Sequence, residues 1–345
     1  MPRSCCSQTT PCCEAQANSP VAEIRQTTSQ LSPADRWDHI TLRWGYKRND
    51  HRVTPGLYAL GQPTPASPVF VTANYTLSFD AVRSALDGVD GYILVLDTHG
   101  INVWCAAGKG TFGTDELARR IEATRLHRVV NHRRLILPQL GASGVAAHEI
   151  KRRTGFGVTY GPVRAGDLPI YLETHQVTPE MRRVRFTLRD RLTLVPIEMV
   201  HVILPLIVAA LILYFASGPI FAAAAAVAIL AGATLFPILL PWLPTRDFSS
   251  QGLILGGLVV LPFIIAALSG EATWLQRVGG ALALGLALPP VTAYLSLNFT
   301  GATTFTSKTG VEREMATYVP VMAWLFGSGV FIWIVTTALR WLHIA

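Results

Sequence analysis

The chain divides near Pro196 into two stretches with different patterns of hydrophobic and polar positions. Before this residue, short apolar runs alternate with polar segments, whereas after it long apolar runs are separated by short gaps. Five of the later runs can cross a hydrocarbon core as helices, which takes about 20 apolar residues each. We predict spans at 197–216, 219–243, 251–269, 273–298 and 319–342. The pattern therefore predicts an all-α transmembrane domain of about five helices over 191–345.

In the first stretch, apolar runs that are typical of buried strands alternate with segments of helical spacing. Strands are predicted at 69–72, 92–96, 134–137 and 158–160, and helices at 78–86, 114–130 and 144–154. Ser78 is the predicted N-cap of the first helix. This alternation predicts a doubly wound, Rossmann-like α/β domain over 31–190. Residues 31–62 are expected to wrap onto this domain, and residues 1–30, rich in Ser, Thr, Gln and Pro, to form a flexible tail.

The charged residues are also unevenly divided between the stretches before and after Pro196. Of the 29 Lys and Arg residues, 24 lie before Ile197, as do 17 of the 22 acidic residues, so the first stretch carries a net charge of +7 and the second none. A lipid-facing segment must confine charge to the interfaces, whereas a soluble domain can place it anywhere on its surface. The charge distribution therefore argues against a large helical core in a soluble protein.

The loops between the predicted spans indicate an orientation. Arg246 lies in the loop 244–250, and Lys308 and Arg313 lie in the loop 299–318. Basic residues stay on the cytoplasmic side of a membrane, and the N-terminus has no apolar stretch that could serve as a secretory signal. We expect a multi-pass protein of the inner (cytoplasmic) membrane, with its soluble domain in the cytoplasm.

A net charge of +7 beside a bilayer suits attraction to anionic lipid headgroups or docking to an acidic partner protein. Nucleic acid is not a predicted partner, because the basic residues are scattered and form no binding motif. Four of the five cysteines, Cys5, Cys6, Cys12 and Cys13, lie in the tail. They could bind a soft metal or belong to a disordered terminus.

The fifth cysteine, Cys105, follows the strand 92–96. The segments 72–75, 97–109 and 138–142 all come after predicted strands, so the topology of a parallel sheet brings them to one edge. Near a helix N-terminus, unpaired amides favour a thiolate, and Lys109 adds a cation. The small residues 106–108 leave room for a flat, bulky ligand. The residues alone leave two interpretations open, a thiolate nucleophile or metal ligand and an inert buried cysteine.

The run Asn102–Lys109 (NVWCAAGK) resembles the signature of the HgcA family, the corrinoid proteins of bacterial and archaeal mercury methylation. The similarity extends from about Trp37 to the C-terminus and leaves the cysteine-rich tail unaccounted for. It includes the segments 71–75, 94–97, 110–113, 135–141 and 160–164. The corrinoid domain of that family is itself similar to the large subunit of the corrinoid iron–sulfur protein of acetyl-CoA metabolism.

The resemblance implies that Cys105 is the catalytic residue and the lower axial ligand of cobalt, on a helix beneath the corrin ring. Asn102 and Trp104 would shape this helix, with Lys109 close by. The cofactor-binding run implied by the resemblance is Asn102, Val103, Trp104, Cys105, Ala106, Ala107, Gly108 and Lys109. Further contacts to the corrinoid or its nucleotide tail are expected from Thr72, Gln139, Leu140, Gly141 and Ala142.

The implied activity is transfer of a methyl group from the cobalt(III) of a cobamide to Hg(II). Mercury(II) is an electrophile, so it takes methyl with the bonding electrons or as a radical, and thiolate ligation of cobalt favours both routes. Cobalt must then be reduced, and this chain lacks the iron–sulfur spacing C-x₂-C-x₂-C-x₃-C. The partners implied are HgcB, a ferredoxin-like protein with two four-iron clusters that is also thought to hand over mercury, and a methyl-folate-type methyl donor.

Two other functions stay open at this stage. The chain could be a corrinoid methyl carrier whose acceptor is not mercury. It could also be a membrane transporter or receptor with a soluble sensing domain. A transporter would need ionisable residues inside the spans, and these are nearly absent from the sequence.

Overall fold

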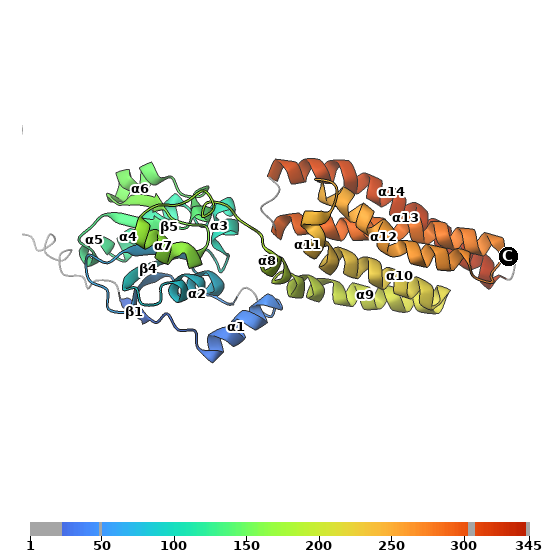
Figure 1. Cartoon of the computed structure of the whole chain (residues 1–345), viewed down its shortest axis with the longest axis horizontal. Coiled ribbons are helices and arrows are strands. Elements are labelled where there is room, and N and C mark those ends of the chain that lie inside the picture. Colours follow the sequence, from blue (N-terminus) through green and yellow to red (C-terminus); the bar gives the residue numbers. More distant parts are fainter. Residues whose placement is uncertain (1–22, 48–49, 303–307, 343–345) are drawn as a thin grey trace, which may run out of the picture. The chain divides into compact units, whose positions relative to one another are not determined.

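The computed structural model describes residues 23–47, 50–302 and 308–342. The described residues form two compact units, one of residues 23–42, 47 and 50–184 and the other of residues 43–46, 185–302 and 308–342 (Figure 1). The first is a mixed α/β domain and the second is helical, as the sequence predicts. Cys5, Cys6, Cys12 and Cys13 lie outside the described residues.

The α/β unit is built on one six-stranded sheet of order β1-β2-β4-β3-β5-β6. Neighbouring strands run parallel except for β2 and β4, which are antiparallel. In the register of the two central strands, Val71 pairs with Leu94. The strands are β1 (Ile24–Thr27), β2 (Gly56–Leu60), β3 (Val69–Ala73), β4 (Gly91–Leu96), β5 (Arg134–Leu137) and β6 (Gly157–Tyr160).

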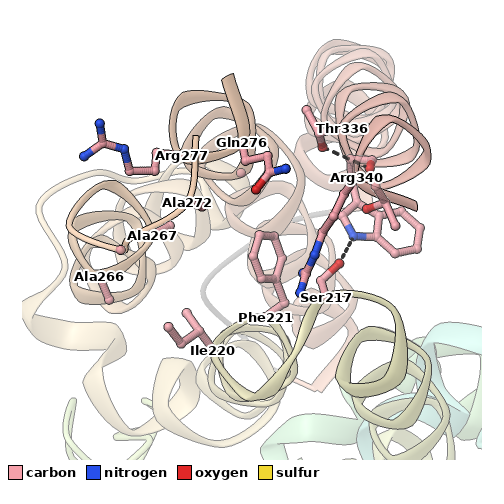
Figure 2. Close-up of a pocket in the computed structure, with 14 residues that line it drawn as sticks. Ser217, Ile220, Phe221, Ala266, Ala267, Ala272, Gln276, Arg277, Thr336 and Arg340 are labelled. Carbon is pink, nitrogen blue, oxygen red and sulfur yellow. Dashed lines mark hydrogen bonds between the residues drawn. The ribbon is translucent and has the colours of Figure 1, made fainter. Parts of the chain in front are cut away.

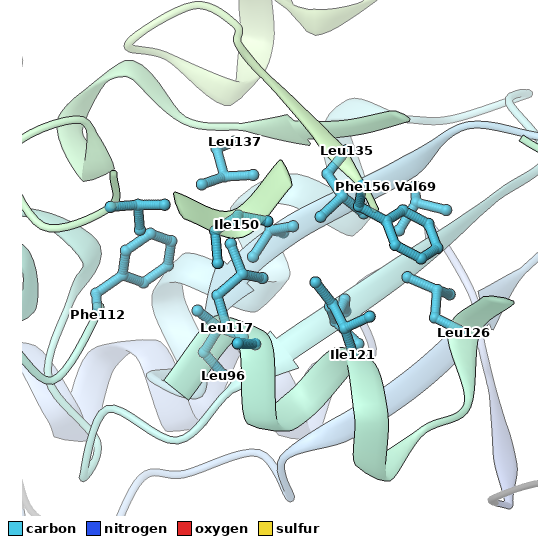
Figure 3. Packing of buried hydrophobic residues seen from close by; sticks show 14 of the residues in the cluster. Val69, Leu96, Phe112, Leu117, Ile121, Leu126, Leu135, Leu137, Ile150 and Phe156 are labelled. Carbon is cyan, nitrogen blue, oxygen red and sulfur yellow. The ribbon is translucent and has the colours of Figure 1, made fainter. Parts of the chain in front are cut away.

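Helices cover both faces of this sheet, so the central strands β3 and β4 are buried throughout. They are α1 (Pro33–Arg43), α2 (Thr76–Ala85), α3 (Val103–Lys109), α4 (Thr114–Ala123), α5 (Leu126–Val129), η1 (Gln139–Gly141), α6 (Ala147–Thr154), η2 (Ala165–Asp167) and α7 (Leu168–Thr174). On one face, Val71 packs in a cluster with residues of α3, α4 and α6. Figure 3 shows part of this cluster, with Val69 of β3, Leu117 of α4 and Ile150 of α6. On the other, Phe70 packs with residues of α2 and α7. Side chains alternate along a strand, which is why adjacent residues serve the two cores.

Several predicted elements need correction. Strand β1 lies inside the segment predicted as a flexible tail, and β2 lies in the segment predicted only to wrap onto the domain. Strand β1 was missed because its four residues, IRQT, have no apolar run. The predicted helix 114–130 is interrupted at Arg125, whose φ of 47° is left-handed. Helix α2 begins at Thr76, so Tyr75 rather than Ser78 is its N-cap. Helix α6 begins at Ala147, three residues after the predicted start.

Five helical segments of the described chain are long and apolar enough to cross a membrane, at 188–217, 219–242, 248–268, 274–298 and 309–341. Their elements are α8 (Leu188–Leu192), α9 (Val195–Ser217), α10 (Pro219–Leu230), the π-helical η3 (Ala231–Leu235), α11 (Phe236–Leu239), η4 (Leu240–Trp242), α12 (Phe248–Leu268), α13 (Trp274–Asn298), η5 (Phe299–Ala302) and α14 (Lys308–Trp341). Most of the predicted loop 299–318 is therefore helical, because a polar segment of good helix formers can extend a span beyond the bilayer.

Small residues and polar side chains hold the helical unit together. A Cβ added to Gly256 of α12 would lie 2.7 Å from the Cα of Pro289 in α13, so the two backbones approach closely. The buried Thr292 hydroxyl donates to the carbonyl of Ala228 at 2.9 Å. The buried Glu314 of α14 accepts from the amide of Ser249, in the first turn of α12, at 2.6 Å. Close backbone approach and interhelical hydrogen bonds of this kind are typical of helix packing in membranes.

Candidate functional site

A buried asparagine joins the ends of the two central strands. Asn74 follows β3, and its Oδ1 accepts hydrogen bonds from the Thr98 amide at 3.0 Å, the Thr98 hydroxyl at 2.9 Å and the Gly100 amide at 3.0 Å. Its Nδ2 donates to Asp97 at 3.2 Å. The side chain is buried, so these partners satisfy it. The expected convergence of segments 72–75 and 97–109 is thus confirmed at the carboxyl edge of the sheet.

A buried carboxylate supports the same loop from the other side. The Asp97 amide donates to Glu116 Oε1 at 2.8 Å, and Glu116 lies in the first turn of α4. Arg119 and Arg120 both pair with this carboxylate. A buried charge is tolerated only when it is paired and hydrogen-bonded, as here. The loop after β4 is therefore held at both of its sides before α3 begins.

Cys105 lies on the short helix α3. The Asn102 side chain caps this helix by accepting from the Cys105 amide at 2.9 Å, and Gly110 ends it in a left-handed conformation with φ of 82°. Val103, Ala106 and Ala107 are buried in the core, whereas Trp104 and Cys105 are half-buried and Gly108 and Lys109 are exposed. Cys105 is a free thiol. Since residues three apart share a helix face, Cys105 and Gly108 lie together on the outer side of α3.

Two glycines near this helix have opposite surroundings. A Cβ at Gly144 would collide with the Phe112 carbonyl oxygen and lie 3.0 Å from the Cα of Ala107, so only glycine allows this close approach. A Cβ at Gly108 would meet no atom within 4 Å. The space over Gly108 is open, whereas the contact below α3 is tight. Gly144 thus holds the loop after η1 against the inner side of α3.

The third predicted segment, 138–142, also reaches this edge. Its η1 helix packs beside α3, and a Cβ at Gly141 would lie 2.5 Å from the Phe112 ring, which is part of the core in Figure 3. Leu140 packs against the same core. Gln139 accepts a hydrogen bond from Arg182 at 3.4 Å, and Ala142 is half-buried. The structure therefore brings the predicted residues 139–142 close to the Cys105 helix.

Thr72 is placed differently from the other predicted contacts. It is buried inside β3, and its side chain shares the face of Phe70, which is covered by α2 and α7. Helix α3 covers the opposite face. The residues that sequence reasoning did not assign are Asn74, Thr98 and Glu116, which position the loop. An asparagine directly after a buried strand is the one signal that could have pointed to them.

The Cys105 sulfur is the soft donor atom that the site offers to a metal ion. Within the described ranges, no group of three or more His, Cys, Asp or Glu side chains is arranged to hold a metal ion. His99 lies 3.7 Å from Asp97, with its side chain largely exposed. A metal at Cys105 would therefore take its remaining donors from a ligand. The site can offer such a ligand a thiol, an open helix face and a nearby ammonium group.

The fold and the site define a class of protein, an α/β domain whose loops gather at the carboxyl edge of its sheet, the edge at which open α/β sheets bind ligands. Residues 41–172 match the family described as the CO dehydrogenase/acetyl-CoA synthase delta subunit. This match contains α3 and strands β2 to β6, and it ends before the first membrane span. Apart from residues 43–46, the match lies within the α/β unit.

Curated relatives are similar over little more than a third of the chain. The acetyl-CoA decarbonylase/synthase complex subunit gamma of Archaeoglobus fulgidus is 37% identical over 139 residues, which are 39% of this chain and 29% of that protein. The subunit gamma of Methanopyrus kandleri is 34% identical over 128 residues, 36% of this chain and 27% of that protein. The chain thus spans less than a third of the length of these relatives.

Proposed function

We propose that this chain is a membrane-anchored, corrinoid-dependent methyltransferase that methylates Hg(II), with Cys105 as the axial ligand of cobalt. The observation that carries the proposal is the free, half-exposed thiol of Cys105 on the outer face of α3. It lies within the run Asn102–Lys109 that resembles the HgcA signature. Similarity to subunits of the acetyl-CoA decarbonylase/synthase complex supports the corrinoid methyl-carrier part of the proposal.

The residues around Cys105 fit a corrinoid. A corrinoid would bring its own nitrogen donors for cobalt, so the chain would need to supply a single ligand, and the Cys105 thiolate would be a strong donor. Gly108 adds no side chain on the face that carries Cys105, so a flat ring can approach the helix. Lys109 is exposed at the end of α3 and could pair with an anionic part of the cofactor. Residues 139–142 lie beside α3, where they could contact its periphery.

When bound, the corrinoid supplies a cobalt centre that accepts and releases methyl groups. Cys105 would lose its thiol proton on binding cobalt, and its thiolate would donate electron density to the metal. This donation would favour transfer of methyl to electrophilic Hg(II), either with the bonding electrons or as a radical. Asn102 acts as a positioning residue, because its hydrogen bond to the Cys105 amide orients the helix turn that carries the sulfur.

The proposal extends to partners and location. A ferredoxin-like protein with two four-iron clusters, of the HgcB type, would return electrons and deliver Hg(II), and a methyl-folate-type donor would supply methyl groups. The basic first stretch suits docking to an acidic carrier. The five membrane-length helices support a multi-pass protein, and the basic residues Arg246 and Arg313 favour a cytoplasmic α/β unit.

The test uses the full-length protein and its Cys105 variants. Cys105→Ala is expected to abolish methylmercury formation in cells, and Cys105→Thr, which offers a neutral oxygen, to impair it severely. In the purified protein loaded with a cobamide, the paramagnetic spectrum of cobalt(II) should show an axial sulfur ligand that Cys105→Ala lacks. Normal methylation by Cys105→Ala at equal protein level would contradict the assignment, as would axial nitrogen or water in the unchanged protein.

A second candidate is a corrinoid methyl carrier whose acceptor is not mercury. It is favoured by the names of the relatives, which are subunits of acetyl-CoA decarbonylase/synthase complexes. Methylated metabolites of cells with and without the gene product would distinguish the two. Loss of a carbon metabolite at unchanged methylmercury formation would favour this second function, and the reverse pattern would favour the first.

A further inference from the structure

The helical unit contains a cavity of about 260 Å³ at one end of its bundle. It lies between the turn that follows α9, the C-terminal end of α12, the start of α13 and the last turns of α14 (Figure 2). The residues that matter most to its chemistry are Ser217, Phe221, Arg277, Trp333 and Arg340. None of them belongs to the site around Cys105.

The cavity is cationic. Two arginines line it, and its lining includes no acidic residue. Arg340 is exposed and extends between Phe221 and Ser217 in Figure 2. Among the described residues it has no ion-pair partner, whereas Arg277 donates to the Leu268 carbonyl at 3.5 Å and keeps its buried Nε without a partner. A cationic side chain near a membrane-spanning helix is stable only when an anion or water compensates its charge.

A further hydrogen-bond donor faces the same space. The indole Nε1 of Trp333 donates to Ser217 Oγ at 2.8 Å. The serine hydroxyl accepts this bond through its oxygen and can in addition donate its own hydrogen to a ligand. Arg340 and Ser217 thus offer charged and neutral donors to an acceptor between them. Phosphate oxygens are the acceptors that an arginine guanidinium binds best, since it can bind two of them at once.

The surroundings of the cavity are typical of the headgroup layer of a bilayer. Trp274 begins α13 and Trp341 ends α14, and each is 69% exposed. Tryptophan concentrates at membrane–water interfaces, with its ring among apolar groups and its N–H toward water. Apolar residues of α10 and α12 complete the wall beside the arginines. A ligand with a phosphate next to an apolar part would match both kinds of surface.

We infer that this cavity binds a phosphate group through Arg340 and Ser217. A phospholipid headgroup is the source that the tryptophans and apolar wall favour, and free inorganic phosphate is the other source. The inference depends on the helical unit alone and is independent of the chemistry proposed for Cys105.

The experiment measures binding to delipidated full-length protein in a neutral detergent, with short-chain phosphatidylglycerol, the corresponding diacylglycerol and inorganic phosphate as separate probes. Phosphatidylglycerol should bind at least about tenfold more tightly than diacylglycerol, the expected value of a charge-assisted hydrogen bond. Arg340→Gln and Ser217→Ala should each weaken its binding, and Arg340→Lys, which keeps the charge but cannot bind two oxygens at once, should weaken it less than Arg340→Gln. Arg313→Gln, on the same helix α14, is the matched control and should bind normally.

The three probes distinguish a phospholipid headgroup from free inorganic phosphate. Tight phosphatidylglycerol binding with weak inorganic phosphate binding identifies the headgroup, whereas equal affinities that both depend on Arg340 identify free phosphate. Either result supports the site. Binding of phosphatidylglycerol that Arg340→Gln and Ser217→Ala leave unchanged, in protein with a normal size-exclusion profile, overturns it. Equal binding of phosphatidylglycerol and diacylglycerol overturns it as well.

Discussion

The side-chain oxygen of Asn102 lies 2.9 Å from the amide nitrogen of Cys105 and accepts its hydrogen. This single contact caps α3 and fixes the turn that carries the thiol. A helix of seven residues gains little from its own cooperativity, so its cap and its packing must hold it. The local stability of α3 and the position of the Cys105 sulfur are therefore coupled.

Asn102→Ala should destabilise α3 by about 1 kcal/mol, because the Cys105 amide loses its acceptor. Hydrogen exchange of amides in 103–109 would measure the change in the free energy of local opening. The cobamide-loaded variant should also show a smaller fraction of sulfur-ligated cobalt(II). Asn102→Asp keeps an acceptor and is the matched control. Wild-type protection and a full sulfur signal in Asn102→Ala would contradict the coupling.

Gly108→Ala should stabilise helix α3 but weaken cofactor binding. The added methyl meets no atom of the chain within 4 Å, and alanine favours a helix over glycine by about 1 kcal/mol, so α3 should become more protected in hydrogen exchange. The same methyl enters the space proposed for the ring and should weaken cobamide binding, measured by titration of the unloaded protein. Gly166→Ala, another position with open space, should leave the affinity unchanged. Unchanged affinity in Gly108→Ala would place the ring elsewhere.

Gly144→Ala should have the opposite effect on folding. Its methyl would press on the backbone of Phe112 and Ala107, which cannot move aside as a flexible side chain could. Such overpacking typically costs about 1–3 kcal/mol. The expected result is faster exchange over 103–113 and less folded protein at equal expression. Exchange rates equal to those of the unchanged protein would show that the loop after η1 adapts.

Arg83 ties the first segment of the α/β unit to α2. Its guanidinium pairs with Asp80 at 2.6 Å and Asp35 at 2.8 Å, and it donates to the carbonyls of Thr28 and Gln30. Burial acts to lower the pKa of Arg83, but hydrogen bonds with Asp80 and then Asp35 leave the pKa above its ordinary value. The network therefore stabilises the charged arginine.

Arg83→Met should cost about 3 kcal/mol in local stability, because the buried Asp80 loses its principal cation. The readout is the opening free energy of α2 and β1 from hydrogen exchange. Arg152→Met is the control, since the Arg152 side chain is 78% exposed and its loss should change stability by less than about 0.5 kcal/mol. Equal effects of the two substitutions would contradict a special role for Arg83.

The ion pair between Asp35 and Arg83 should make the stability of this region depend on pH. Burial acts to raise the pKa of Asp35, but hydrogen bonds from Arg83 and Ser32 outweigh it and leave the pKa below its ordinary value of 3.8. A lowered folded-state pKa stabilises the fold above the ordinary value, and this contribution is lost as the pH falls through the folded pKa. Protection of β1 and α1 should therefore decrease on acidification below about pH 4. Asp35→Asn should start less protected and show a smaller decrease; an identical decrease would contradict the assignment.

The central part of the fold was predictable because its signals are local. Strand β4, Gly91–Leu96, is continuously apolar since both of its faces are covered, and the five helices that are long enough to cross a membrane follow from apolar length. Strand β1 carries no such signal, because an edge strand can be short and polar and takes its structure from its neighbour β2. The left-handed break at Arg125 has no sequence signature either.

The sequence by itself determined the two-part architecture, the order of strands and helices around 69–160, and the short helix that displays Cys105. Each depends on residues close together in the chain. Only the tertiary structure decided that Asn74 holds the Thr98 loop, that Gly144 packs beneath Ala107, that Thr72 belongs to the opposite face, and that Arg340 and Ser217 share a cavity. These relationships join residues 24 to more than 100 positions apart, so they arise from packing and no local pattern records them.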